Sequence, residues 1–109
     1  MPNLDDLIRD HLSKDGQVLN LKAKFLREVG AKELAKREDL KEVRAMDLSQ
    51  NGIGDEGVKA IAESEMFINL RNLNLASNLI TDVGAKCLAN SQKLIKLRSL
   101  QLVVNDISE

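Results

Sequence analysis

Aromatic side chains are almost absent from this chain, which has two Phe residues and no Trp or Tyr among its 109 residues. Protein cores and interfaces usually take much of their buried area from aromatic rings. Since 43% of the residues are still hydrophobic, the core must be built almost entirely from aliphatic side chains. We expect Phe25 and Phe67 to occupy core positions, which leaves no exposed rings on which nucleic-acid bases could stack.

Cysteine, charge of one sign and long apolar runs are also scarce. Cys87 is the only cysteine, which excludes an intramolecular disulfide and a cysteine-based metal cluster. The 16 basic and 17 acidic residues are interspersed and give a net charge of −1, so no nucleic-acid or membrane partner is predicted. The N-terminal residues 1–12 are acidic and lack the apolar stretch of a signal peptide or membrane span. We therefore expect a cytoplasmic protein without a cofactor or metal.

What the sequence does contain is an internal repeat. The motif L-x-x-L-x-L-x-x-N-x-I occupies residues 70–80 and returns at residues 97–107. A variant of it occupies residues 43–53, with Val43 and Met46 in place of the first two leucines. The motif asparagines follow one another at intervals of 27 residues, at Asn51, Asn78 and Asn105.

The second half of each unit has the same period. Gly57, Lys59, Ile61 and Ala62 correspond to equivalent residues 27 positions later, with Leu88 in place of isoleucine, and the same pattern occurs 27 residues earlier, from Gly30 to Ala35. A degenerate first repeat therefore precedes the others, with Lys24 in the place of the asparagine. We assign a capping helix to residues 1–15 and repeats to residues 16–42, 43–69 and 70–96, with a partial repeat at 97–109.

Each repeat predicts one strand followed by one helix. The L-x-L segment alternates with the period of a strand that buries one face, and the segment after the asparagine has helical spacing. Asp55 and Asp82 stand at the helix starts, where a carboxylate complements the helix dipole. We expect the glycines of the helices to let them approach the sheet closely. One such unit cannot bury its own apolar face, so stacked neighbours must complete the core.

The asparagines are expected to turn inward at the bend after each strand. A side-chain amide both donates and accepts hydrogen bonds, so it can satisfy backbone groups that the bend would leave unpaired. Because Lys24 replaces the first asparagine, we predict that this structural asparagine ladder starts at the second repeat. Its members are Asn51, Asn78 and Asn105.

The motif L-x-x-L-x-L-x-x-N-x-I, followed by D-x-G-A-K-x-L-A in 27-residue units, resembles the leucine-rich repeats of the ribonuclease-inhibitor and Ran GTPase-activating-protein type. The resemblance covers residues 16–109. It implies an α/β fold, a right-handed solenoid in the form of a short horseshoe segment, with a parallel sheet on the concave face and helices on the convex face. It also implies recognition of proteins rather than a shared enzymatic activity.

The two ends of the array are predicted to differ. Residues 3–14 place Leu4, Leu7, Ile8 and Leu12 on one helical face, with Asn3 as the N-cap, as a terminal cap requires. At the other end, no helix follows the last predicted strand, and a free strand edge can pair with another chain. The edge fits a longer array, a homodimer or a strand added by a partner, and a homodimer is our leading hypothesis. The candidate edge residues are Leu100, Gln101, Leu102, Val103, Val104 and Ile107.

A second candidate surface is the concave face, to which the intervening strand positions are expected to point. Its candidate residues are Asp47, Ser49, Gln50, Asn72, Asn74 and Ser77. They are small or polar and include none of the Trp, Tyr or Arg residues that usually dominate binding energy, so a solvated face is the simpler interpretation. Val103 and Val104 break this polar pattern, which favours a contact surface at the last strand.

The sequence therefore predicts a protein-interaction module or scaffold that is not an enzyme and has a protein partner. No base stands beside Cys87 to make it a nucleophile, and helix capping explains the pair Asp55 and Glu56. Two alternatives stay open. One is a regulator of a small GTPase, for which Arg27 is the lone candidate in a comparable loop, and the other is a self-assembling unit that pairs through its C-terminal strand.

Overall fold

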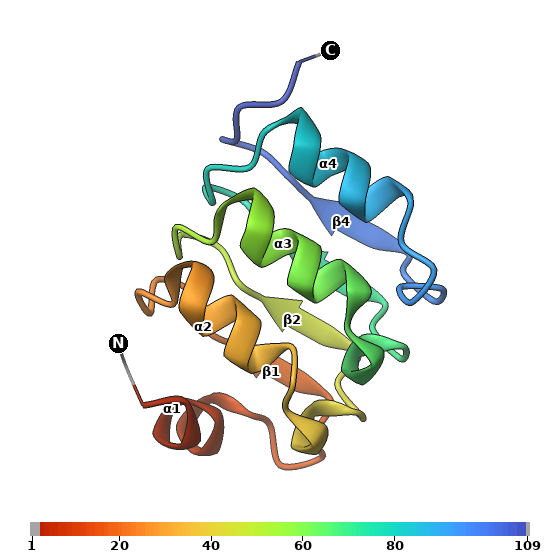
Figure 1. Ribbon diagram of the computed structural model, residues 1–109. Helices are drawn as coiled ribbons and strands as arrows, with labels where there is room; N and C mark the ends of the chain where they lie inside the picture. The colour runs from red at the N-terminus through yellow and green to blue at the C-terminus, as the bar shows by residue number, and fades with distance from the viewer. Residues whose placement is uncertain (1–2, 109) are drawn as a thin grey trace.

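The computed structural model describes residues 3–108, which form two layers within an envelope of 38 × 28 × 19 Å. One layer is a four-stranded parallel sheet, and helices α2, α3 and α4 stack on one of its faces (Figure 1). The elements are α1 (Leu4–His11), β1 (Val18–Asn20), α2 (Arg27–Leu34), η1 (Glu38–Leu40), β2 (Ala45–Asp47), α3 (Gly54–Glu63), η2 (Glu65–Phe67), β3 (Asn72–Asn74), α4 (Asp82–Ala89) and β4 (Ser99–Gln101).

The strands lie in the order β1-β2-β3-β4, and each pairs in parallel with the next. Their register is the sequence repeat itself, because Leu19 pairs with Met46, Met46 with Leu73, and Leu73 with Leu100. Neighbouring strands are therefore related by a shift of one repeat. The predicted α/β solenoid with a parallel sheet is confirmed.

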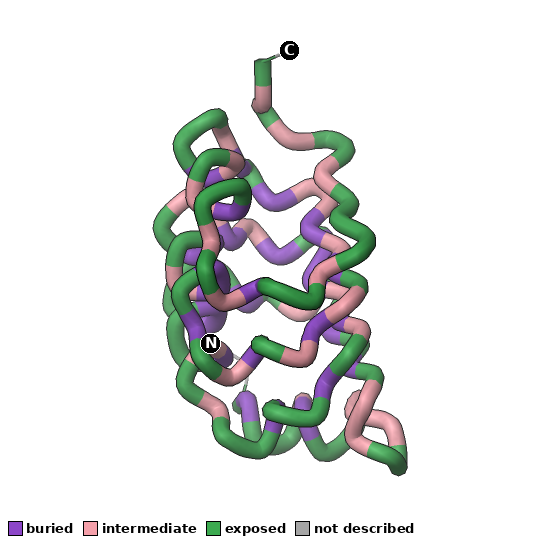
Figure 2. The backbone as a smooth tube through the Cα atoms, turned by 90° about the vertical axis from the view of Figure 1, so that its right-hand side faces the viewer, coloured by how far each residue is buried: buried purple, intermediate pink, exposed green. Residues whose placement is uncertain are grey.

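The core lies between the sheet and the helices, where buried positions from both layers face each other (Figure 2). It is aliphatic apart from Phe67, which is fully buried. The prediction that Phe25 also occupies the core is wrong, because its side chain is 69% exposed. Phe25 has a left-handed backbone with a φ of +58°, and Leu26 fills the core position beside it.

The helix glycines have a different role from the predicted one. A Cβ built on Gly57 would lie 2.4 Å from Cγ2 of Ile53 and 3.1 Å from Cβ of Ala31 on the neighbouring helix α2. On Gly84, the nearest atom would be a carboxylate oxygen of Asp55 on α3, at 2.5 Å. None of these atoms belongs to a strand. Gly57 and Gly84 allow neighbouring helices to approach one another, whereas a Cβ on Gly30 would meet only Leu26 of its own repeat.

Helix α1 packs at the β1 end of the array. The side chain of Asn3 caps it by accepting a hydrogen bond from the N–H of Asp6 at 3.2 Å, and Leu4 and Ile8 are buried in the common core. After the helix, Leu12 forms an antiparallel bridge with Leu19 of β1. This end of the sheet is thereby covered, while the assignment of residues 1–15 as a cap and of the repeat boundaries stays a prediction.

Candidate interaction surfaces

The three motif asparagines join neighbouring repeats through their side-chain amides. The Nδ2 of Asn78 donates to the carbonyl oxygen of Leu48 at 2.9 Å, and its Oδ1 accepts from the N–H groups of Asn51 and Ile53 at 3.0 and 3.2 Å. Asn105 makes the same contacts one repeat later. These amides provide hydrogen-bond partners for the backbone groups of the bend after each strand.

The first repeat receives the same support without an asparagine of its own. The Oδ1 of Asn51 accepts from the N–H groups of Lys24 and Leu26, and its Nδ2 donates to the carbonyl oxygen of Leu21 at 2.8 Å. Each asparagine amide thus hydrogen-bonds backbone groups of the repeat before it. The first repeat, in which Lys24 replaces the asparagine, therefore still has its backbone groups bonded by Asn51.

A second network between the repeats involves carboxylates at the helix starts, which sequence reasoning treated only as helix caps. The carboxylate of Asp55 accepts hydrogen bonds from the hydroxyl of Thr81 at 2.6 Å and from the N–H groups of Thr81 and Gly84. Asp82 accepts equivalent bonds from Ser108. The signal was present in the sequence, because Thr81 and Ser108 repeat with the same 27-residue interval as the two aspartates.

These bonds shift the acidity of both carboxyl groups. Burial alone would raise the pKa of Asp55, but the hydrogen bonds from Thr81 and Gly84 outweigh it and hold the pKa below its ordinary value. The hydroxyl and N–H of Ser108 likewise lower the pKa of Asp82. Both groups are therefore charged, engaged acceptors at neutral pH.

The outward face of the sheet is a shallow hollow that crosses all four strands. Asn20, Asp47, Asn74 and Gln101 lie in one register row across it, and Asn72 is exposed in the neighbouring row. The other side chains that line the hollow are Val18, Ala45, Met46, Leu73 and Ser99.

Three of the predicted concave-face residues lie beyond the strands, in the loops that follow them. Ser49 is only 4% exposed and is not part of an open face, because its N–H and hydroxyl both bond to the carboxylate of Asp47. Gln50 and Ser77 follow in the left-handed region, with φ values of +59° and +57°. Of the predicted set, Asp47, Asn72 and Asn74 share the sheet face.

The edge at β4 is less covered than the earlier strands. Leu73 is 2% exposed, while Leu100 at the matching place is 37% exposed. Val103 and Val104 are 55% and 78% exposed, Gln101 is exposed, and Leu102 and Ile107 are half-buried. All six candidate edge residues are thus at least partly exposed to solvent.

The loops between strands and helices expose further apolar side chains that sequence reasoning did not single out. Phe25, Gly52 and Leu79 occupy the same place in successive repeats, and all three have left-handed backbones. Phe25 and Leu79 are 69% and 72% exposed. Gly52 at the matching place of the middle repeat was the sequence signal for this exposed position, because glycine marks a place where the backbone has a positive φ.

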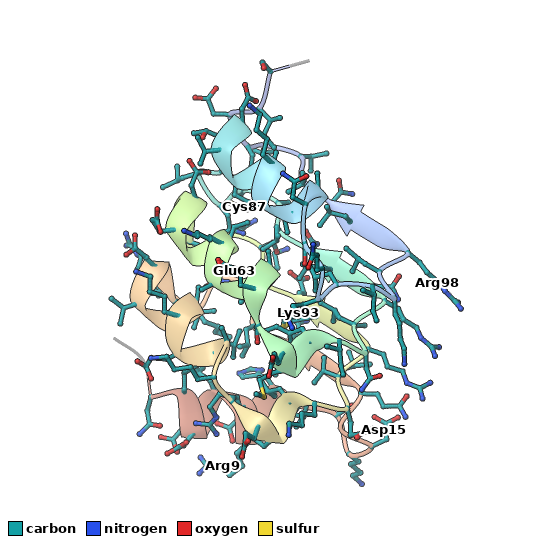
Figure 3. The ribbon with its side chains drawn as sticks, turned by 45° about the vertical axis from the view of Figure 1, so that its right-hand side comes forward. Arg9, Asp15, Glu63, Cys87, Lys93 and Arg98 are labelled. Atoms are coloured by element: carbon teal, nitrogen blue, oxygen red, sulfur yellow. The ribbon has the colours of Figure 1, made fainter. Side chains whose placement is uncertain are left out.

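On the helix side, a groove between α3 and α4 holds the single cysteine. Cys87 lies on α4 and Glu63 on the neighbouring α3 (Figure 3). Cys87 is half-buried, and Lys59, Lys86 and Lys93 also line the groove. Lys93 donates to the carboxylate of Glu65 at 3.3 Å. The mixture of charges is that of a hydrated outer face.

Two negative findings concern the described residues. Between residues 3 and 108, no three or more His, Cys, Asp or Glu side chains are grouped so that they could hold a metal ion. In the same part of the chain, no helix has the length and apolarity needed to cross a membrane.

Parallel strands in a single 27-residue register, helices on one face and asparagines that bridge the repeats define a parallel α/β solenoid. Residues 43–62 and 68–89 match the family model of the leucine-rich repeat. These two segments are therefore similar to leucine-rich repeats, in agreement with the resemblance of the motif to the ribonuclease-inhibitor type. No curated protein matches the chain significantly.

Proposed function

We propose that this protein is a non-catalytic interaction module that binds a protein partner through the open face of its sheet. The observation that carries this proposal is the hollow across the four strands, whose side chains come from every repeat. Leucine-rich repeats generally serve protein interaction, which supports the same function.

The sheet face is well suited to binding because its side chains are held in place before a partner arrives. Asn20, Asp47, Asn74 and Gln101 stand in register, about one strand spacing of 4.8 Å apart. Rigid elements position a binding surface more precisely than loops do. Folding has therefore already ordered this polar row, so binding of a partner loses less side-chain conformational entropy.

Affinity capture from a native lysate tests this proposal with two matched variants. Asn72→Arg places a long charged side chain in the hollow, while Lys36→Glu changes an exposed residue on the helix side. We expect the proteins retained by the wild type to be lost from Asn72→Arg and kept by Lys36→Glu. Identical retained sets for the wild type and Asn72→Arg would contradict binding at the sheet face.

Self-association through β4 is a second candidate, favoured by the exposure of Val103 and Val104. The chain before this strand and the loop after it also carry opposite charges. Arg98 precedes β4 and extends away from the sheet (Figure 3), and Asp106 follows it. Antiparallel pairing of two copies about a twofold axis would bring each Arg98 towards the Asp106 of the other copy, which gives a closed, self-complementary interface.

Sedimentation tests the homodimer directly. We expect a dimer that Val103→Lys dissociates, that Arg98→Glu weakens, and that the double variant Arg98→Glu with Asp106→Arg restores. A stable monomer at tens of micromolar would contradict self-association and leave the interaction module in place.

Regulation of a small GTPase remains the third candidate, carried only by the exposed Arg27 at the first position of α2. It requires that the protein accelerate GTP hydrolysis and that Arg27→Ala abolish the acceleration. Equal hydrolysis rates with and without the protein would remove this candidate.

A further inference from the structure

Two loops between strands and helices, together with the first residue of α2, carry a row of exposed side chains that we call the loop rim, defined by Phe25, Arg27 and Leu79. Phe25 and Leu79 have φ values of +58° and +63°, at the place where the middle repeat has Gly52 with a φ of +63°. The two apolar side chains are 69% and 72% exposed. The same backbone position thus holds glycine once and a large exposed apolar residue twice.

Both large residues are unfavourable for the folded chain at this place. A left-handed backbone brings the Cβ of an L-residue too close to the next carbonyl oxygen. An exposed ring or isobutyl group also forgoes the stabilisation that burial gives. Gly52 avoids both effects within an otherwise equivalent turn, so the repeat needs neither side chain to fold. Strained residues of this kind concentrate at binding sites.

Arg27 occupies the space that Gly52 leaves open. A Cβ on Gly52 would lie 3.2 Å from Cδ and 3.7 Å from Nε of Arg27. Arg27 is itself exposed and left-handed, with a φ of +60°. Since Phe25 and Leu79 are two repeats apart, about two strand spacings or 10 Å, the guanidinium lies over the middle repeat between them.

The free charge around Phe25 and Arg27 is positive. Lys22 and Lys24 precede Phe25 in the sequence, and in the described part of the chain neither they nor Arg27 form an ion pair. Three carboxylates of the first two repeats are already engaged, whereas Asp106 lies beside Leu79 at the far end of the loop rim. Glu28 pairs with Lys32 at 2.9 Å, Asp47 accepts from Ser49, and Asp55 accepts from Thr81.

We propose that the loop rim binds a segment of a partner protein that carries a carboxylate flanked by apolar side chains. The carboxylate pairs with Arg27, whose planar guanidinium suits a bidentate contact, and the apolar side chains pack on Phe25 and Leu79. Arginine is also one of the residue types that most often dominate binding energy. The inference rests on the proposed function as an interaction module and specifies the chemistry of its partner.

The test starts with a displayed library of random 12-residue peptides selected against the intact chain, followed by fluorescence anisotropy of the enriched peptides. We expect the enriched peptides to contain an acidic residue beside apolar ones. We also expect Phe25→Gly and Leu79→Gly to weaken their binding by about tenfold or more, as loss of a dominant contact does.

The glycine variants separate loss of binding from loss of folding. Because glycine fits the left-handed backbone, both should melt at a higher temperature than the wild type while they bind less. Ile95→Ser is the matched control, since it removes another exposed apolar side chain, 71% exposed, outside the loop rim. It should leave peptide affinity unchanged.

Three results would overturn the inference. The first is a selection that enriches no acidic peptide, and the second is a peptide affinity of Phe25→Gly within about twofold of the wild type, since loss of a dominant contact predicts far more. The third is a single-stranded oligonucleotide that binds more tightly than the peptides and depends on Arg27. If Asn72→Arg is instead the only variant that loses peptide binding, the proposal for the loop rim is wrong and the proposal of binding at the sheet face stands. If neither peptides nor lysate proteins bind, both proposals fail.

Discussion

The Oδ1 of Asn78 accepts a hydrogen bond from the backbone N–H of Asn51 at 3.0 Å, so each motif asparagine is fixed by the one in the next repeat. Asn51 is 2% exposed and Asn78 is 0% exposed, so water cannot replace the bond. Neighbouring repeats are therefore coupled through polar groups at one end of the strands and through apolar packing along them. Such nearest-neighbour coupling is what stabilises a solenoid.

Removal of this amide should cost more in the middle of the array than at its last strand. Asn78→Ala leaves the N–H groups of Asn51 and Ile53 without an acceptor, and each buried unpaired group costs about 1–3 kcal/mol. Asn105 is half-buried, so water can reach the groups that Asn105→Ala exposes. We expect urea unfolding to show the larger loss for Asn78→Ala, and equal losses would contradict the coupling described above.

The close approach of α2 and α3 should make Gly57 intolerant of even one methyl group. Gly57→Ala places its Cβ against Ile53 and Ala31, and overpacking of this kind costs about 1–3 kcal/mol. Lys59→Ala on the same helix changes an exposed side chain and should stay within about 0.5 kcal/mol of the wild type. Thermal unfolding of both variants measures the difference. An unchanged Gly57→Ala would mean that the helices are farther apart.

The stability that Asp55 contributes should depend on pH in one direction. Its pKa in the folded state is below the ordinary value, which is about 3.9 in an unfolded chain. The contribution is therefore fully present above about pH 4 and is lost as the pH falls from there through the folded-state pKa.

Asp55→Asn should accordingly be less stable than the wild type at pH 7, with a difference that shrinks below about pH 4 as the wild-type carboxyl becomes protonated. Denaturant titrations of both proteins at a series of pH values measure this. If the difference in the free energy of unfolding stays constant from neutral to acidic pH, the hydrogen bonds of Thr81 and Gly84 do not depend on the charge of Asp55.

The two phenylalanines should respond to substitution in opposite ways. Phe67 is fully buried, so Phe67→Ala should lower the free energy of unfolding by about 3–5 kcal/mol. Phe25→Gly should raise it by about 1 kcal/mol, because it removes the left-handed strain of an L-residue. Differential scanning calorimetry compares both with the wild type. Destabilisation by Phe25→Gly would mean that the exposed ring contributes packing within the chain.

The sequence was informative where the 27-residue period controls the structure. It predicts the parallel register of Leu19, Met46 and Leu73 and the inward turn of Asn78, because both repeat residue by residue. It misplaced Phe25, since an apolar residue next to a core leucine looks buried until the sign of φ is known.

Contacts between repeats were harder to predict than contacts within one. The partners of Gly57 and Asp55 lie on neighbouring helices, and the spacing along one helix carries no information about which atoms of the next helix it meets. Ser49 looked like a surface residue for a different reason. Its burial follows from the local bond to Asp47, not from the alternation of the strand.

Amide hydrogen exchange of the protein, alone and with its captured partner, tests the interaction module most directly. The account predicts slower exchange on binding in the strands that form the sheet face, around Asp47 and Asn72, and in the loops that hold Phe25 and Leu79. The helices α2, α3 and α4 should keep their exchange rates. Protection confined to those helices, with the sheet face and the loops unchanged, would contradict the account.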